Sequence, residues 1–231
     1  MPFFYLDYWY IVLVVPALLL AFWAQINVNT TFSRYSKVTA PSGMTGAESA
    51  RRVLEANGVV GVRIERISGN LTDHFDPKTN TIRLSESVYD ATTVSAVGVA
   101  AHEAGHAVQY AVGYSPMKLR AAIIPATNIG SQLAMPLVLL GLLLSSAMLV
   151  DIGIVAFSMS TLFQLVTLPV EFNASRRAVA TLEASCVSAA EVKGAKAVLR
   201  AAALTYVAAL AVSLASLLRI ILLFGGRSRR D

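Results

Sequence analysis

The segment AHEAGHAVQY, residues 101–110, holds two of the three histidines of a chain of 231 residues. His102 and His106 are four residues apart, so on a helix both imidazoles lie on one face and can bind the same metal ion. Neutral imidazole is a good ligand for zinc. Glu103 lies about 100° around the helix, where it can reach a water molecule beside the ion. This H-E-x-x-H spacing is typical of zinc metallopeptidases, in which the glutamate is the general base.

Two other interpretations of this segment were weighed. The order of the three residues can arise by chance, or the segment can be a buried polar helix of a transporter. The transporter hypothesis does not explain a costly carboxylate on a helix of Ala, Gly and Val. The sequence therefore predicts a metal site with one zinc ion per chain and no other cofactor.

A catalytic zinc site usually has three protein ligands, so a third is needed. We expect it to be Glu171, which directly follows an apolar run and opens a helix after Pro169. A bound cation would offset the cost of a carboxylate at a membrane boundary. The alternative is an ion pair of Glu171 with Arg176 or Arg177. The other candidates are less suitable. His74 and Cys186 each have a plainer use, and Asp151 lies on the other side of the membrane by the charge distribution. Asp231 is terminal, and Glu183 and Glu191 lie in a stretch that we expect to be solvated.

The composition predicts a membrane protein. Hydrophobic residues make up 55% of the chain and charged residues 14%, against about 25% charged residues in soluble domains. Four apolar runs approach the roughly 20 residues that a membrane-spanning helix needs. A turn at Asp151 separates the second run from the third. The runs are Tyr8–Ala24, Ile129–Val150, Ile152–Val170 and Ala201–Phe224.

The basic residues predict the orientation. Ten lie between Asn27 and Arg120 and five between Glu171 and Arg200. The positive-inside rule places both segments in the cytoplasm and the N-terminus outside. Three arginines after residue 224 oppose this if the last run spans the membrane. The net charge of +5 follows from this distribution, so we expect a lipid bilayer and no nucleic acid as partner.

The polar segment predicts a small α+β domain. Thr45 and Glu48 have capping-box spacing before a helix that ends at Gly58. A strand is expected at 62–67, a hairpin at 71–85 with its turn at 76–80, and the helix carrying the motif at 92–112. The expected divisions are an anchor at 1–26, a cytoplasmic catalytic segment at 27–126, a transmembrane hairpin at 127–170, a cytoplasmic helical segment at 171–200 and a last span with a basic tail at 201–231.

Four stretches resemble the YugP-like family of bacterial membrane zinc metallopeptidases: LTDHFDPKTNTIRLSE, GVAAHEAGHAVQYAVGYSP, LFQLVTLPVEFNASRRA and GAKAVLRAAALTYVAA. More distantly, EFNASRRA resembles the E-x-E-A-D helix of HtpX-like and CAAX-prenyl-type proteases, gluzincins whose first Glu is the third zinc ligand. By position this Glu is Glu171, while Asn173 and Ser175 stand where the distant pattern has acids.

The resemblance implies a mainly α membrane protein with a zincin-like catalytic domain facing the cytoplasm, in the inner membrane of a bacterium. It also implies that the strand TIRLS, residues 81–85, runs beside the active-site helix. That strand either pairs with an extended substrate or is an internal strand of the sheet.

Three further residues have two interpretations each. His74 either stabilises an oxyanion or orients substrate, or it is a turn histidine without a special role. Asn173 and Arg176 either support the metal ligands or lie on a helix surface.

The sequence as a whole predicts an integral membrane zinc metalloendopeptidase that cleaves peptides or membrane proteins near the cytoplasmic surface. The alternatives are a zinc-binding membrane scaffold or chaperone without catalysis, and a site-2-type intramembrane protease.

Overall fold

The computed structural model describes residues 7–185 and 187–224. Its internal contacts divide the chain into two units. The polar unit comprises Gln25–Lys118 and Pro169–Leu204. The apolar unit comprises the described parts of Met1–Ala24, Leu119–Leu168 and Thr205–Asp231. The five divisions expected from the sequence, including their sides of the membrane, stay predictions.

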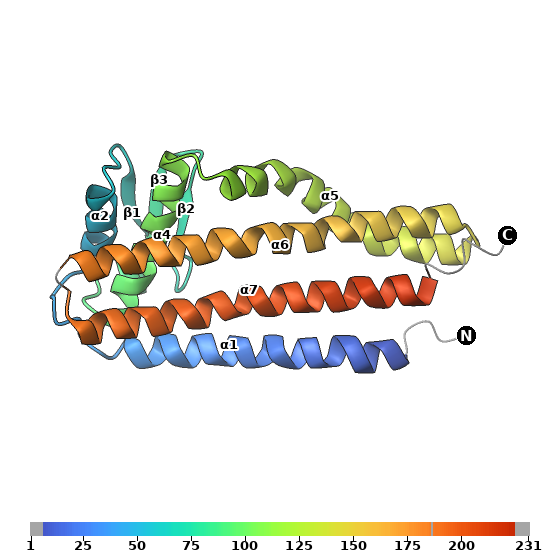
Figure 1. The fold of residues 1–231 in the computed structure, drawn as a ribbon, viewed down its shortest axis with the longest axis horizontal. Helices are drawn as coiled ribbons and strands as arrows, with labels where there is room; N and C mark the ends of the chain where they lie inside the picture. Colours follow the sequence, from blue (N-terminus) through green and yellow to red (C-terminus); the bar gives the residue numbers. More distant parts are fainter. Residues whose placement is uncertain (1–6, 186, 225–231) are drawn as a thin grey trace. The chain divides into compact units, whose positions relative to one another are not determined.

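Among the described residues, four helices are long and apolar enough to cross a membrane: Tyr10–Tyr35, Ser115–Leu143, Ala147–Ala184 and Ala189–Phe224 (Figure 1). The first consists of a π-helical turn, η1 (Tyr10–Val14), and α1 (Val15–Tyr35); the others are α5, α6 and α7. These helices and one small sheet confirm the prediction of a mainly α membrane protein with about four spans.

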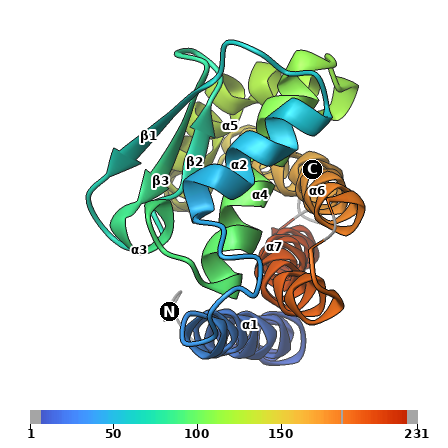
Figure 2. The same ribbon diagram turned by 90° about the vertical axis from the view of Figure 1, so that its left-hand side faces the viewer.

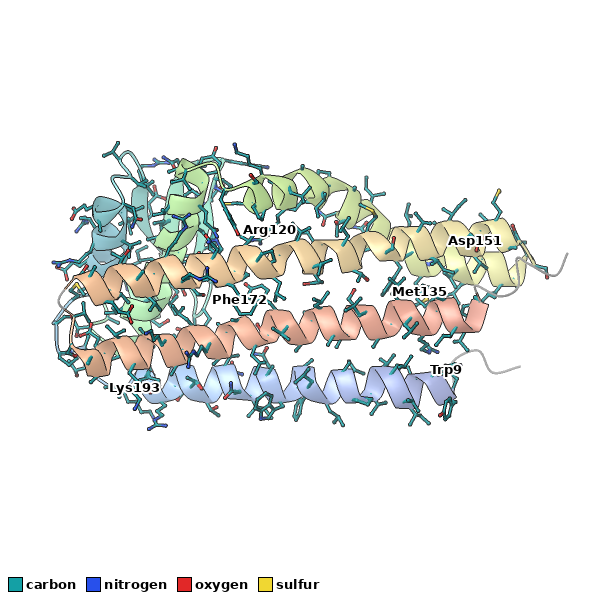
Figure 3. The ribbon with its side chains drawn as sticks, in the orientation of Figure 1. Trp9, Arg120, Met135, Asp151, Phe172 and Lys193 are labelled. Atoms are coloured by element: carbon teal, nitrogen blue, oxygen red, sulfur yellow. The ribbon has the colours of Figure 1, made fainter. Side chains whose placement is uncertain are left out.

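The turn between the second and third spans differs from the prediction. α5 ends at Leu143 and α6 begins at Ala147, so the turn occupies residues 144–146. Ser145 adopts a positive φ of 51°, and the amide of Ser146 donates a hydrogen bond of 2.8 Å to the carbonyl of Gly141. Asp151 instead lies within the first turns of α6 (Figure 3). Hydropathy is high on both sides of this turn, so the apolar pattern of the sequence does not mark its position.

The helix that carries Glu171 also differs from the prediction. α6 runs without interruption from Ala147 to Ala184, so Glu171 lies inside a long helix and does not open a new one. Pro169 is accommodated within it. A break at a proline would leave more backbone groups without partners than the single lost hydrogen bond does. Cys186, Asp231 and the three arginines of the basic tail lie outside the described residues.

Small residues bring α5 and α6 close together in the apolar unit. A Cβ atom placed on Gly141 would lie 2.7 Å from the backbone nitrogen of Val150, and one on Gly153 would lie 2.9 Å from the carbonyl oxygen of Ala134. Such close backbone approach is a common way for membrane helices to pack. At the ends of the same unit, Arg219 donates a hydrogen bond of 2.8 Å from Nε to the carboxylate of Asp7.

The polar unit contains the sheet and three shorter helices. β1 (Arg63–Ile67), β2 (His74–Asp76) and β3 (Thr81–Ser85) form a sheet in the order β1-β3-β2. β3 pairs parallel with β1 and antiparallel with β2, so both of its edges are occupied. α2 (Gly46–Ala56) and α4 (Val94–Ala111) lie against one face, and α3 (Glu86–Tyr89) follows β3 (Figure 2). The predicted strand and hairpin are confirmed, and the TIRLS segment is an internal strand.

Local signals position these elements as expected. The side chain of Thr45 accepts a hydrogen bond from the amide of Glu48, and the carboxylate of Glu48 accepts one from the amide of Thr45. This is the predicted capping box. Gly58 follows α2 with a φ of +66°. In the core, the hydroxyl of Ser49 donates to the carbonyl of Val97 at 2.9 Å and ties α2 to α4.

Glu191 is a correction, because the sequence predicted a solvated carboxylate. Its residue is 1% exposed, and its oxygens accept hydrogen bonds from the amide of Ser42 at 3.0 Å and from the hydroxyl of Ser42 at 2.7 Å. Ser42 precedes it by 149 positions, so no local pattern reveals the pair. Glu183 lies at the surface beside Lys196, as expected.

Candidate metal centre

α4 presents both motif histidines on one face. The side chain of Thr93 accepts a hydrogen bond from the amide of Ala96 and caps the helix. The rings of His102 and His106 lie edge to face with centroids 4.7 Å apart. Gly105, which lies between the two histidines in the sequence, allows very close contact with α6: a Cβ atom there would lie 2.5 Å from the carbonyl oxygen of Ala174.

Glu171 reaches this face from α6. Its Oε2 lies 3.2 Å from Nε2 of His102 and 3.5 Å from Nε2 of His106. Glu171 is 2% exposed. The three residues form a group whose potential ligand atoms all lie within 4.8 Å of one another. The fold thus brings together the three residues that the sequence predicted as ligands.

Further side chains contact the outer nitrogens of the two imidazoles. The hydroxyl of Ser175 lies 3.1 Å from Nδ1 of His102. Oε1 of Gln109 lies 3.0 Å from Nδ1 of His106, and Nε2 of Gln109 donates to the carbonyl of Val170 at 2.8 Å. Groups that hold the outer nitrogen of a ligating histidine orient its ring and select its tautomer.

The site favours positive charge. Burial opposes the charged form of His106, but hydrogen bonding to Glu171 and the charges of Glu103 and Glu171 outweigh it, so the pKa of His106 is raised. A second acid lies near Glu103. Burial raises the pKa of Asp73 despite hydrogen bonds from Ser85, and the charge of Glu103 adds to the rise. Several carboxylates around one small volume stabilise a cation there.

Glu103 lies next to His102 in the chain and is 9% exposed. Within the described chain, no side chain or backbone group donates a hydrogen bond to its carboxylate. The carboxylate oxygens of Glu171 and Asp73, in contrast, contact His102 and the amide of Ser85. The carboxylate of Glu103 is thus suited to exchange a proton with a bound reactant.

His74 lies on the edge strand β2 and is exposed. Its Nδ1 lies 2.8 Å from the carbonyl oxygen of Thr72, which can only accept, so Nδ1 carries the hydrogen. Only a protonated His74 can then donate from Nε2. The next residue, Phe75, contacts Tyr110 with ring centroids 5.8 Å apart, so β2 lies beside the end of α4 that follows His106.

Asn173 and Arg176 have different surroundings. Asn173 accepts hydrogen bonds from Nε2 of Gln109 at 3.1 Å and from Nε of Arg177 at 2.8 Å. Arg176 is exposed, whereas its neighbour Arg177 reaches the network. Sequence reasoning missed Gln109, although its position three residues after His106 places it on the neighbouring turn of α4. It also missed Asp73, for which no local pattern gives a signal.

Residues 10–225 match the family described as "putative neutral zinc metallopeptidase". The chain belongs to this family. It is also 49% identical to the "putative membrane protease YugP" of Bacillus subtilis (strain 168) over 216 residues, which cover 93% of the chain and 96% of the relative. No solved structure matches the chain. The family and the four apolar helices of the described residues support a membrane protein with a protease function of the zinc class.

The candidate ligands of this family member fit zinc. In a tetrahedral site with ligand bonds of 2.0–2.1 Å, neighbouring ligand atoms are about 3.3 Å apart. The distances of 3.2 and 3.5 Å from Oε2 of Glu171 to the two Nε2 atoms are close to this value. Two imidazoles and one carboxylate also form a common donor set of catalytic zinc.

Proposed function

We propose that the chain is an integral membrane metalloendopeptidase of the gluzincin type, with one zinc ion held by His102, His106 and Glu171. The observation that carries this proposal is the convergence of these three side chains from two helices, with His102 and Glu171 69 positions apart in the chain, at distances suited to zinc. Zinc held there would polarise a peptide carbonyl and lower the pKa of an attacking water to about 7.

In this proposal Glu103 is the general base. Its carboxylate takes a proton from the attacking water and passes it to the leaving amine. β2 is an edge strand beside the end of α4, and an edge strand can pair with an extended peptide. The backbone of β2 is thus suited to align a substrate, and a protonated His74 on that strand can donate to an oxyanion.

The position of Glu171 along α6 supports a metal site near the membrane surface. Glu171 follows the start of the helix, Ala147, by 24 residues, or about 36 Å at 1.5 Å per residue. The hydrocarbon core is only about 30 Å thick. α4, which carries both histidines, is not among the four candidate spans of the described chain. These points favour a surface peptidase over a site-2-type protease, and the basic residues favour the cytoplasmic face.

The experiment compares purified wild type with Glu171→Gln, Glu103→Gln and the control Glu183→Gln, which alters an exposed carboxylate on the same helix. Zinc content by mass spectrometry and casein cleavage are measured for each. We expect about one zinc per chain in the wild type, loss of zinc in Glu171→Gln, and retained zinc without cleavage in Glu103→Gln.

Two results would contradict the proposal. Full zinc content in Glu171→Gln would mean that the third ligand lies elsewhere. A wild type that holds zinc but cleaves no peptide or membrane protein would favour the zinc-binding scaffold.

A further inference from the structure

Gln109 is a fully buried polar residue one turn after His106 on α4. Its amide makes three hydrogen bonds, one to the imidazole of His106 and two to groups on α6. One of these groups is the carbonyl of Val170, the residue directly before Glu171. A single side chain therefore contacts one candidate zinc ligand and the backbone that carries another.

The hydrogen bonds determine which way this amide points. The carbonyl of Val170 can only accept, so the nitrogen of Gln109 faces it. The second hydrogen of that nitrogen goes to Oδ1 of Asn173, whose identity as oxygen follows from the hydrogen bond that Nε of Arg177 donates to it. Both donors of the Gln109 amide are used, and its oxygen faces His106.

This orientation decides the tautomer of a neutral His106. Oε1 of Gln109 accepts only, so Nδ1 of His106, 3.0 Å away, carries the hydrogen. In this neutral tautomer Nε2 carries the lone pair that a metal ion can use, 3.5 Å from Oε2 of Glu171. Which imidazole nitrogen is available to a metal is set by the hydrogen bond that the other nitrogen makes.

We propose that Gln109 is a positioning residue that prepares both helices for the metal. It holds His106 in the tautomer whose Nε2 can bind zinc, and it tethers the peptide before Glu171 to the histidine helix. The proposal rests on the proposed zinc site. His102 has no equivalent, because the hydroxyl of Ser175 both donates and accepts and leaves its tautomer open.

The test uses the full-length chain in detergent micelles, as wild type, Gln109→Met and Gln109→Glu. The control is Ser49→Ala, which removes another buried hydrogen bond from a side chain to a backbone carbonyl on α4. Zinc affinity is measured by competition with a chelator. The histidine tautomers are measured by ¹⁵N NMR on metal-free, histidine-labelled protein at a pH where the imidazoles are neutral; three histidines give few signals.

Gln109→Met is expected to bind zinc about 10- to 100-fold more weakly and to lose the pure Nδ1–H form of His106. Ser49→Ala should keep the wild-type affinity and tautomer. Gln109→Glu keeps an oxygen beside Nδ1, so it should keep the tautomer, but it binds zinc more weakly because its second oxygen faces the Val170 carbonyl. This variant also serves if Gln109→Met does not fold.

The inference is overturned if Gln109→Met keeps both the Nδ1–H form and a zinc affinity within about twofold of wild type. It is equally overturned if wild-type His106 carries its hydrogen on Nε2. Absence of zinc from the wild type would instead refute the proposed function, and the NMR measurement on metal-free protein would still decide the role of Gln109.

Discussion

Replacing Gly105 by alanine tests how closely α4 and α6 must approach. The added Cβ atom would lie 2.5 Å from the carbonyl oxygen of Ala174, 3.1 Å from its carbonyl carbon and 3.2 Å from its Cα. All three are backbone atoms of α6, so no side-chain rotation relieves the contact. Ordinary contacts between non-bonded heavy atoms are about 3.5 Å, and the helices must therefore separate by up to about 1 Å.

This separation is large for a metal site. Ala174 is three residues after Glu171 on the same helix, and metal–ligand distances tolerate only about 0.2 Å of change. Overpacking of this kind costs about 1–3 kcal/mol. If the zinc-bound state bears that cost, zinc affinity falls by about fivefold to 150-fold, because each 1.4 kcal/mol is a factor of ten.

The matched control is Gly98→Ala on the same helix. Its Cβ atom would meet the Cα and Cβ atoms of Ala195 at 3.3 Å, which requires a shift of only a few tenths of an ångström. Ala195 lies on α7, which carries none of the candidate ligands. Zinc affinity by chelator competition, the cobalt absorption spectrum and casein cleavage are measured for both variants. Wild-type zinc affinity and a wild-type cobalt spectrum in a folded Gly105→Ala protein would refute this reasoning.

Three further predictions concern the scaffold. Arg83, with Thr79 and the amide of Lys78, holds the pKa of Asp76 below its usual range. The ionised Asp76 therefore stabilises the fold fully above the ordinary aspartate pKa of about 3.9, and this stabilisation is lost as the pH falls through the lowered pKa. Asp76→Asn should thus lower the melting temperature at pH 7, and its melting-temperature difference from wild type should shrink as the pH falls below about 3.9. A difference that is the same at pH 7 and at acidic pH contradicts this. Thr161→Val removes the 2.8 Å hydrogen bond to Ser213 and should cost about 0.6 kcal/mol in detergent unfolding, with no effect on zinc affinity. Thr45→Ala removes a helix cap and should cost about 1 kcal/mol in the same assay, and an unchanged stability would mean that the capping box contributes nothing.

Local patterns in the sequence were sufficient for much of the scaffold. Runs of apolar residues identified the four membrane helices because crossing a bilayer requires such a length. The capping box at Thr45 and the hairpin turn before Thr81 were predicted because caps and turns depend on neighbouring residues. The spacing of His102 and His106 placed both imidazoles on one helix face for the same reason.

Contacts between distant residues needed the tertiary structure. Hydropathy did not locate the turn at Ser145 or show that α6 continues through Pro169, because an apolar run has the same composition on either side of a turn or kink. Burial of Glu191 depends on a serine 149 positions away.

Some features of the candidate site could likewise be predicted from local patterns, and others could not. Residue types and spacing suggested His102, His106 and Glu171 as ligands, and that assignment stays a prediction until zinc is measured. The distances between them, the approach of α6 at Gly105 and the role of Gln109 follow only from helix packing. A sequence determines which groups are available for chemistry, whereas the ångström-scale distances that metal binding requires arise when separate helices pack together.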